Sequence, residues 1–378
     1  MMRMMNNYAM WQIKLLTSAD FRRLSGRAQL EYFCHLASLA PSTHNSQPWR
    51  FFIDENKNIA DIYLDRTFVL PASDVAGHQA TISLGCAIEN FTVAAAALGI
   101  KTHMESILQP KDRLFPFEKQ KNDPRYVPLA RLQCIISQQN ALPSDLYKAI
   151  ITRKVMRAEF DPQHPIPKDV IKKLEHAADG RKTKLHIITD AVRRLCIAEF
   201  QGQADGFVIN SPKFSCELGD WLLPNSTDSS LGMPGAGFGL KSAEALRIHN
   251  GLLGKAPLEP EDGLKFALGG KIGMEKSPMI CCITIPKDDP LHWIEAGRSF
   301  ERMFLTLESC GLSVAVHAGI VEVPLVSRIF GATLGTIRRP AVLFRTGYVK
   351  DVENKKRPHT PRLPLEKIIL QKRPENES

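Results

Sequence analysis

Two widely separated segments of the chain carry the same three residues at the same spacing. The first set is Gly85, Glu89 and Gly99, which are separated by four and then ten residues. The second set, with the same two separations, is Gly297, Glu301 and Gly311. Each set lies in a segment with helical spacing that ends at its last glycine, a residue suited to the left-handed position after a helix. A chance match is one explanation, because glycine is common after helices. The other is an internal duplication, which would constrain the fold strongly.

The segments around the two sets favour duplication. A strand-like run and a turn precede each helix, at residues 59–64 in the first case and 279–285 in the second, and another strand-like run follows each helix. We therefore predict two copies of one α+β unit, residues 1–150 and residues 151–378, packed together as a pseudo-dimer within one chain.

Further elements follow from apolar spacing and from proline and glycine positions. We expect helices at 27–39, at 167–178 and from about residue 191, strands at 49–53, 132–136 and 185–189, and a surface connection at 120–128.

Composition narrows the classes of function. The formal net charge is +9, but basic residues are spread along the chain and aromatic residues are 7% of it, which argues against nucleic-acid binding and favours a small anionic ligand. No continuous apolar run approaches the roughly 20 residues of a membrane span, and the N-terminus lacks a signal-peptide pattern, so we expect a cytoplasmic protein without a membrane partner. Eight cysteines without a CxxC spacing argue against a zinc ribbon, and we expect no metal site.

A polar loop joins the first predicted helix to the first predicted strand. Residues 41–50 read PSTHNSQPWR, with several short hydrogen-bonding side chains between two prolines that stiffen the ends. Such groups could meet a planar heteroaromatic ring bearing carbonyls and ring nitrogens. They could equally be turn residues that bond to their own backbone, and composition alone favours this second interpretation.

A second unusual segment is rich in glycine, serine and proline. Residues 224–239 read PNSTDSSLGMPGAGFG, which disfavours regular secondary structure. A surface loop is one interpretation. The other is a lid over a ligand, with Leu231, Met233 and Phe238 as its apolar tips.

Three strings resemble those of one family. APSTHNSQPWRF, residues 40–51, closely resembles the flavin loop of the FMN-dependent nitroreductase family. ITRKVMRAEF, residues 151–160, is similar to the basic phosphate-binding segment that normally opens the subunit of that family. TPRLPL, residues 360–365, is similar to the C-terminal segment that supplies another phosphate-binding arginine. The resemblance covers about residues 28 to 370.

The resemblance implies a three-layer α/β/α nitroreductase-like fold, and the order of the segments is similar to the fused, lid-bearing branch of Acg-like proteins. It implies FMN as cofactor and one site per chain, because the Pro-Ser loop occurs in the first half and the basic segment in the second. A backbone amide facing flavin N5 is expected at Ala318 or Gly319. The implied cofactor-binding residues are Pro41, Ser42, Thr43, Asn45, Gln47, Arg153, Lys154, Arg157, Ala318, Gly319 and Arg362.

One residue departs from the family pattern. Val155 stands where the family usually has a hydroxyl residue, so one phosphate hydrogen bond is absent, with a cost of roughly 1 kcal/mol. We predict no catalytic side chain, and we expect His44 and His317 to be neutral, because flavin hydride transfer requires no protein acid of fixed identity.

Two functions from different classes follow from the resemblance. The first is an oxidoreductase in which FMN takes hydride from NAD(P)H and reduces a nitroaromatic or quinone-like acceptor. The second is a protein that binds and sequesters FMN under the lid with little turnover. The resemblance also implies a monomer, since the duplicated chain would supply its own partner.

Overall fold

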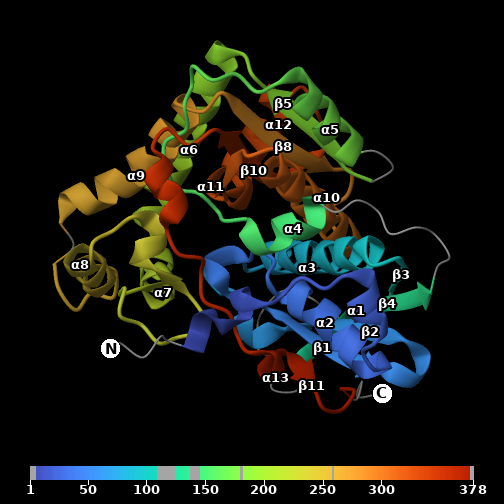
Figure 1. Ribbon diagram of the computed structural model, residues 1–378. Coiled ribbons are helices and arrows are strands. Elements are labelled where there is room, and N and C mark those ends of the chain that lie inside the picture. The colour runs from blue at the N-terminus through green and yellow to red at the C-terminus, as the bar shows by residue number, and fades with distance from the viewer. Residues whose placement is uncertain (1–5, 109–123, 137–144, 179–181, 258, 375–378) are drawn as a thin grey trace.

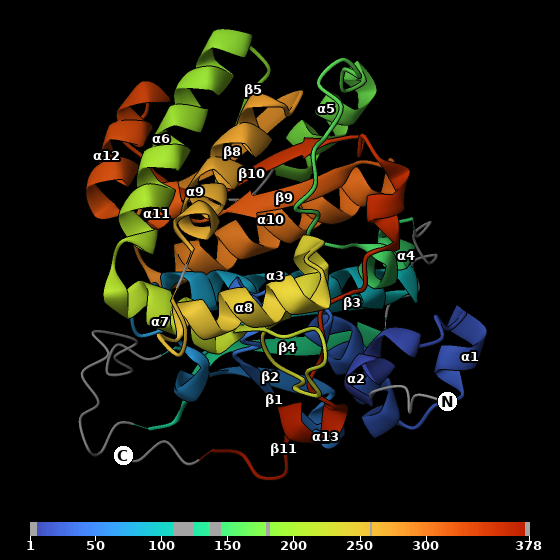
Figure 2. The same ribbon diagram turned by 90° about the vertical axis from the view of Figure 1, so that its left-hand side faces the viewer.

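The structure is a computed structural model that describes residues 6–108, 124–136, 145–178, 182–257 and 259–374. Figures 1 and 2 show two sheets, each packed against a long helix, with these two helices lying side by side between the sheets. The helices are α3 (His78–Ala97) and α10 (Pro290–Ser309).

The first sheet has the strand order β11-β1-β2-β4-β3. Its members are β1 (Trp49–Asp54), β2 (Ile59–Asp65), β3 (Ile100–Ser106), β4 (Tyr126–Ile136) and β11 (Ile369–Leu370). Neighbouring strands are antiparallel except for β11, which comes from the C-terminal end of the chain and runs parallel to β1.

The second sheet repeats this order without an equivalent of β11. It runs β5-β8-β10-β9, and all of its pairs are antiparallel. Its members are β5 (Lys184–Ile188), β8 (Met279–Ile285), β9 (Ser313–His317) and β10 (Arg339–Gly347). In both sheets a helix precedes the first strand, α2 (Gly26–Ser38) or α5 (Lys168–Ala178), and the long helix connects the second strand to the third. The predicted α+β fold and its internal duplication are therefore confirmed, while the boundary at residue 150 stays a prediction.

The two faces of the second sheet carry different helices. Met279, Cys281 and Ile283 of β8 belong to the core shared with α10, whereas the alternate residues Ile280 and Cys282 belong to a second core. That second core includes α6 (Ala191–Ile209), α11 (Gly319–Glu322) and α12 (Pro324–Thr333). Because side chains alternate across a strand, helices cover both faces of this sheet, which gives the predicted α/β/α layering.

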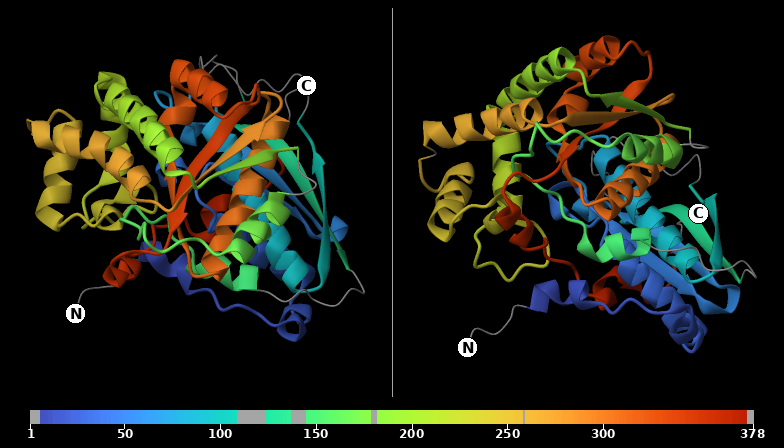
Figure 3. Two further views of the ribbon diagram at one scale, coloured as in Figure 1. Left: turned by 90° about the horizontal axis from the view of Figure 1, so that it is seen from above. Right: turned by 45° about the horizontal axis from the view of Figure 1, so that its top comes forward.

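The second half also contains a large insertion. β1 and β2 are joined by the short helix η3 (Glu55–Lys57), but the chain between β5 and β8 forms α6 and several further elements. These are α7 (Pro212–Trp221), β6 (Leu222–Leu223), β7 (Met233–Pro234), η5 (Gly235–Phe238), α8 (Ser242–Leu252) and α9 (Pro260–Glu275). Figure 3 shows that α8 and α9, in yellow and orange, project from one side of the molecule.

Short elements complete the described chain. They are η1 (Asn6–Gln12), α1 (Ser18–Arg22), η2 (Thr43–Asn45), η4 (Arg66–Phe68), α4 (Asp145–Thr152), η6 (Val352–Lys356) and α13 (Leu365–Ile368).

One expectation needs correction. The predicted surface connection at 120–128 is wrong for residues 126–128, which begin β4; residues 120–123 lie outside the described residues. Pro128 fits this strand because the ladder shifts register opposite it, between Ile62 and Tyr63. Among the described residues, α3 is long and apolar enough to span a membrane by length and composition, but 89% of its apolar window is buried within the protein.

The duplicated glycines lie where the two central helices cross. Gly85 and Gly297 face each other, and a Cβ atom on either would lie 3.0 Å from the Cα atom of the other and overlap a carbonyl oxygen of the facing helix. At the ends of the two helices, Gly99 and Gly311 take φ values of 80° and 78°, the left-handed conformation that the sequence predicts. The repeated spacing thus marks the contact between the two halves.

A methyl group at this crossing should force the halves apart. We expect Gly297→Ala to lower the free energy of unfolding by about 3 kcal/mol, since the added atom meets backbone that cannot move aside. Gly206→Ala in α6 is the matched control: a Cβ there meets nothing within 4 Å, so the change should stabilise the helix by roughly 0.5–1 kcal/mol. Urea denaturation of both variants measures this, and equal stabilities would contradict the close crossing.

Candidate functional site

The loop between α2 and β1 has a strained backbone. His44, Asn45 and Gln47 have φ values of 50°, 57° and 51°, in the left-handed region that residues other than glycine seldom adopt. The Ser42 hydroxyl oxygen accepts a hydrogen bond at 3.0 Å from the backbone N–H of Gln47, which closes the loop on itself. Strained backbone of this kind persists where surrounding contacts hold it, as they do here.

Asn45 and Gln47 hold three segments together. Asn45 Nδ2 donates to the carbonyl oxygens of Gly232 and Pro361, at 3.0 and 2.9 Å. Gln47 Nε2 donates to the Ser230 carbonyl oxygen at 2.7 Å, and Gln47 Oε1 accepts from the Leu363 N–H at 2.9 Å. The predicted flavin loop therefore binds both the Gly-rich segment and the C-terminal segment, and these two predicted ligand residues have protein partners.

Arg362 binds the end of helix α2. Its guanidinium donates to the carbonyl oxygens of Ser38, Leu39 and Ala40 at 3.0 to 3.1 Å and to Asn45 Oδ1 at 2.7 Å. Helix ends leave carbonyl groups unpaired, and a cation there is favourable. Burial, and then the neighbouring Arg153, lower the pKa of Arg362 well below its usual value.

Arg153 follows α4 and is buried beside a carboxylate of α10. Its Nε atom lies 2.9 Å from Glu301 Oε1, and its guanidinium also donates to the Leu39 carbonyl oxygen and lies over the Phe304 ring. Burial raises the pKa of Glu301, and Arg153 opposes that rise. Arg153 and Arg362 thus meet at the end of α2, although one belongs to the middle of the chain and the other to its C-terminal end.

Three further cations are more exposed than Arg153 and Arg362. Lys154 Nζ donates to the carbonyl oxygens of Lys355 and Arg357 at 3.0 and 2.8 Å. Arg157 contacts Met233 Sδ at 3.7 Å, and its Cζ atom lies 4.2 Å from the centre of the Phe238 ring. Arg357 Nη1 is buried without a hydrogen-bond acceptor among the described residues.

These residues line one pocket. Among the described residues, its lining includes five cationic side chains and no carboxylate: Trp11, Pro41, Ser42, Asn45, Arg153, Lys154, Val155, Met156, Arg157, Met233, Gly237, Arg357, Pro358, His359, Thr360 and Arg362. The structure thus brings together seven of the eleven predicted site residues. Thr43 and Gln47 belong to the same loop but are not among the lining residues, and neither are Ala318 and Gly319.

The electrostatic potential in the pocket is positive. Burial, followed by Lys154, Arg362 and Arg153, lowers the pKa of His359 to about 3, so this imidazole is neutral at pH 7. Part of the Arg157 side chain is open to solvent, yet burial of its charge by the protein packed around it, and then Arg357, lower its pKa to about 10. An anion would relieve the repulsion among these cations.

Several pocket residues had no signal in the sequence. Trp11 stacks on His359 with ring centres 3.9 Å apart, donates to the Thr360 carbonyl oxygen at 2.8 Å and lies against Arg362. Arg357 directly follows η6, outside the three strings that resemble the nitroreductase family. The positions of Trp11 and Arg357 depend on long-range packing of both ends of the chain near the predicted flavin loop. Local sequence patterns do not encode such packing.

Ala318 and Gly319 lie at the start of α11, next to α6. A Cβ atom on Gly319 would lie 2.8 Å from Asp205 Oδ1 and 3.1 Å from Gln201 Nε2. His317, just before them, accepts a hydrogen bond at 3.0 Å from Arg345 Nε, and burial lowers its pKa well below the usual range. A neutral His317 agrees with expectation; the role of Ala318 and Gly319 at flavin N5 stays a prediction.

Four carboxyl groups gather between α3, α6, α7 and α11, and the sequence analysis missed them. Burial, and then Asp74, Glu217 and Asp205, raise the pKa of Glu322 well above its usual value. Burial also raises the pKa values of Asp74 and Asp205 to about 7. Glu217 accepts hydrogen bonds from the N–H groups of Ala72 and Ser73, at 2.7 and 3.0 Å, and so ties α7 to the first half.

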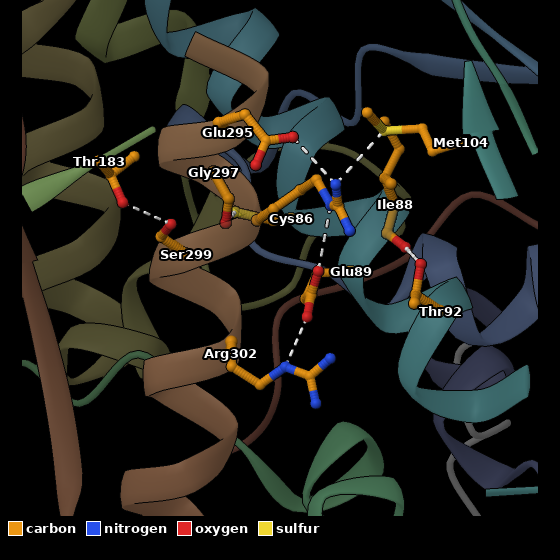
Figure 4. Close-up of polar contacts among 11 residues, drawn as sticks. Cys86, Ile88, Glu89, Thr92, Met104, Thr183, Glu295, Gly297, Ser299 and Arg302 are labelled. Carbon is orange, nitrogen blue, oxygen red and sulfur yellow. Dashed lines mark hydrogen bonds and ion pairs between the residues drawn. The ribbon is translucent and has the colours of Figure 1, made fainter. Parts of the chain in front are cut away.

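The duplicated counterpart of Glu301 has different partners. Glu89, at the equivalent position of α3, pairs with Arg298 at 3.2 Å and with Arg302 at 2.5 Å, both from α10 (Figure 4). Arg298 also pairs with Glu295 at 2.9 Å. Figure 4 shows these pairs beside the contact of Cys86 with Gly297, near the helix crossing. The two halves therefore share a buried glutamate but surround it differently.

Comparison with known proteins finds relatives that align over most of this chain and over most of their own length. No family model matches the chain. It is 24% identical over 339 residues to the Mycobacterium tuberculosis (strain H37Rv) protein named "Putative NAD(P)H nitroreductase acg", covering 88% of this chain and 93% of that protein. The predicted family resemblance is confirmed. A second relative from the same strain, "Uncharacterized protein Rv3127", is 23% identical over 351 residues, 88% of this chain and 90% of its own.

A solved structure also resembles part of the chain. An FMN and NADPH-dependent nitroreductase, NfnB from sphigopyxis sp. strain HMH, aligns with a TM-score of 0.40 and 18% identity over 60% of this chain and 98% of its own.

The buried carboxyl groups predict a pH dependence of stability. Burial raises the Asp205 pKa from 3.8 to about 7, so between these pH values the folded protein holds a proton that the unfolded chain has lost. Stability should therefore fall as pH rises through that window. Asp205→Asn keeps an oxygen that can accept from Gln201 but does not titrate.

We expect Asp205→Asn to remove about 1–2 kcal/mol of the loss in unfolding free energy between pH 4.5 and pH 8, allowing for partial exposure of the carboxyl group. Denaturation curves at both pH values measure this. Asp220→Asn, at an exposed position of α7, is the control and should follow the original protein. Parallel pH profiles for the Asp205 variant and the original protein would contradict the assignment.

Proposed function

We propose that this protein is an FMN-dependent NAD(P)H oxidoreductase that reduces nitroaromatic or quinone-like acceptors and binds one FMN per chain. The observation that carries the proposal is that three segments, 41–45, 153–157 and 357–362, each supply lining residues to one pocket lined by cations. The name of one relative, "Putative NAD(P)H nitroreductase acg", supports the same activity.

The donor set of the pocket fits a phosphate monoester. The FMN phosphate is close to a dianion, and guanidinium groups bind such an anion with two parallel hydrogen bonds. Arg157 contacts a sulfur atom and an aromatic ring, and Arg357 Nη1 is buried without an acceptor among the described residues. These two residues, with Lys154 beside them, are the groups that we assign to the phosphate.

Arg153 and Arg362 have a different role in this proposal. Their guanidinium groups bind carbonyl oxygens of residues 38–40 and, for Arg153, the carboxylate of Glu301. They fix the end of α2 and add positive potential, while the phosphate contacts come from neighbouring cations. Val155 lines the pocket without a hydroxyl, and Arg357 offers a donor in compensation.

Bound FMN would supply the hydride chemistry, and the chain would position it and limit access by water. Asn45 and Gln47 hold the flavin loop against the Gly-rich segment, and the apolar groups Met233 and Phe238 of that segment lie against Arg157. The same contacts motivate the second candidate function, an FMN-sequestering protein, because the segment at 224–239 would act as a lid.

The first test is the absorption spectrum with quantitation of released flavin. We expect one FMN per 42.2 kDa chain and a monomer by size-exclusion chromatography with light scattering. A colourless protein that takes up no added FMN would refute flavin binding. Two flavins per chain would refute the single site while leaving the cofactor in place.

The phosphate assignment is tested by comparing FMN with riboflavin, which lacks the phosphate. We expect Arg157→Gln to weaken FMN binding about 10- to 100-fold and to leave riboflavin binding nearly unchanged, because the lost interaction is with a charged group. Arg193→Gln, at an exposed position of α6, removes the same charge away from the pocket and should change neither affinity. Equal losses for both flavins would remove Arg157 from the phosphate site.

Anaerobic reduction separates the two candidate functions. We expect ~1 mM NADPH or NADH, a typical working substrate concentration, to bleach the visible flavin band within seconds. Bleaching by dithionite but by neither nicotinamide would favour sequestration. Met233→Ala shortens a pocket-lining side chain of the Gly-rich segment. The same measurement on this variant shows whether that segment limits access of the nicotinamide to the flavin.

A further inference from the structure

His44 has two buried ring nitrogens and no partner for either. Both Nδ1 and Nε2 are shielded from solvent without a hydrogen bond to any described residue. Other enclosed histidines differ in this respect. His35 Nε2 lies 2.7 Å from the Met10 carbonyl oxygen, and His249 Nδ1 lies 2.9 Å from that of Leu222. An unpaired buried polar group costs about 1–3 kcal/mol, so two of them on one ring call for an explanation.

The position of His44 places it beside the cationic pocket. Its neighbours Ser42 and Asn45 line that pocket, whereas the His44 ring lies behind the lining, with its centre 6.2 Å from that of the Phe214 ring of α7. Burial, and then the Arg157 charge, lower the His44 pKa to about 3, so the ring stays neutral at pH 7. A neutral imidazole presents one N–H donor and one bare nitrogen acceptor.

The backbone adds a second argument. His44 takes φ 50° and ψ 17°, a left-handed conformation that costs free energy for a residue with a Cβ atom. Asn45 and Gln47 hold the loop in that conformation through their bonds to residues 230, 232 and 361. Backbone strain and unpaired nitrogens therefore coincide at one residue, whose ring stabilises nothing by hydrogen bonding within the described protein.

We propose that the His44 imidazole contacts the ligand of this pocket and donates its N–H to a carbonyl-type oxygen. This inference rests on the proposed function and extends it. Two sources offer such an oxygen, the flavin ring and a quinone or nitro acceptor bound over it. In either case the ring acts by hydrogen bonding, because a neutral imidazole carries no additional proton that it could transfer to the ligand.

Nuclear magnetic resonance of protein labelled with 15N-histidine tests the contact directly. We expect the His44 ring nitrogen signals, identified by their loss in His44→Phe, to shift when FMN is added to apo-protein or when 1,4-benzoquinone is then added to the oxidised holoprotein. Ring signals of His164, an exposed residue beside Tyr348, should stay unchanged.

Binding measurements distinguish the two sources. If His44 contacts the flavin, His44→Phe should weaken FMN binding about 10-fold; if it contacts the acceptor, the FMN Kd should hold and the quinone KM should rise about 10-fold. His44→Asn should recover part of either loss, since asparagine retains a donor and adopts the left-handed conformation readily. His164→Phe is the control and should alter neither constant.

The outcomes separate this inference from the proposal beneath it. A wild-type protein that takes up no FMN overturns both. A wild-type protein that binds FMN, with His44→Phe unchanged in Kd and KM and no shift of the His44 signals, overturns the role of His44 alone. A loss in His44→Phe that His44→Asn does not relieve at all, again without a signal shift, assigns the residue to loop packing and also overturns the inference.

Discussion

The contact of Gly85 with Gly297 is the constraint on which the rest of the structure depends. Side chains at either position would overlap the backbone of the facing helix, so the close crossing of α3 and α10 requires glycine at both. The pocket exists because the halves meet this closely. Arg153 follows α4, Glu301 lies one turn beyond Gly297 on α10, and the carbonyl groups that both Arg153 and Arg362 bind belong to the end of α2 in the other half.

The charges around the pocket then decide which kind of ligand can bind in it. Arg153, Arg362 and Lys154 obtain carbonyl or carboxylate partners from the chain, while Arg157 and one nitrogen of Arg357 face the pocket with little compensation. Crowded cations destabilise a folded protein, and a bound dianion removes that repulsion, so ligand binding and stability are linked. Burial, and then the charge of these cations, lower the pKa values of the His44 and His359 imidazoles, which are therefore neutral.

The sequence predicts the fold well because its signals are local. Glycine spacing marks the crossing, residues 279–285 form the predicted strand as β8, and residues 26–38 form the predicted helix as α2. The strings at 40–51, 151–160 and 360–365 identify the segments that converge. What they do not encode is which partner each side chain meets. Asn45 and Gln47 look like ligand groups in the sequence but bind the backbone of residues 230–232 and 361–363, and Trp11 and Arg357 reach the pocket through long-range packing.

Fusion of two copies into one chain allows the two halves to diverge, and the buried glutamates show how. Glu301 keeps an arginine from the basic segment and lies beside the pocket, whereas Glu89 is neutralised by Arg298 and Arg302 of α10. In a homodimer both glutamates would need the same surroundings, and the insertion from α6 to α9 would occur twice. In the fused chain it occurs once, between β5 and β8, and its Gly-rich segment binds the flavin loop of the other half. Duplication therefore supplies the scaffold, while the loss of symmetry allows one half to supply the loop at 41–50 and the other the Gly-rich segment that binds it.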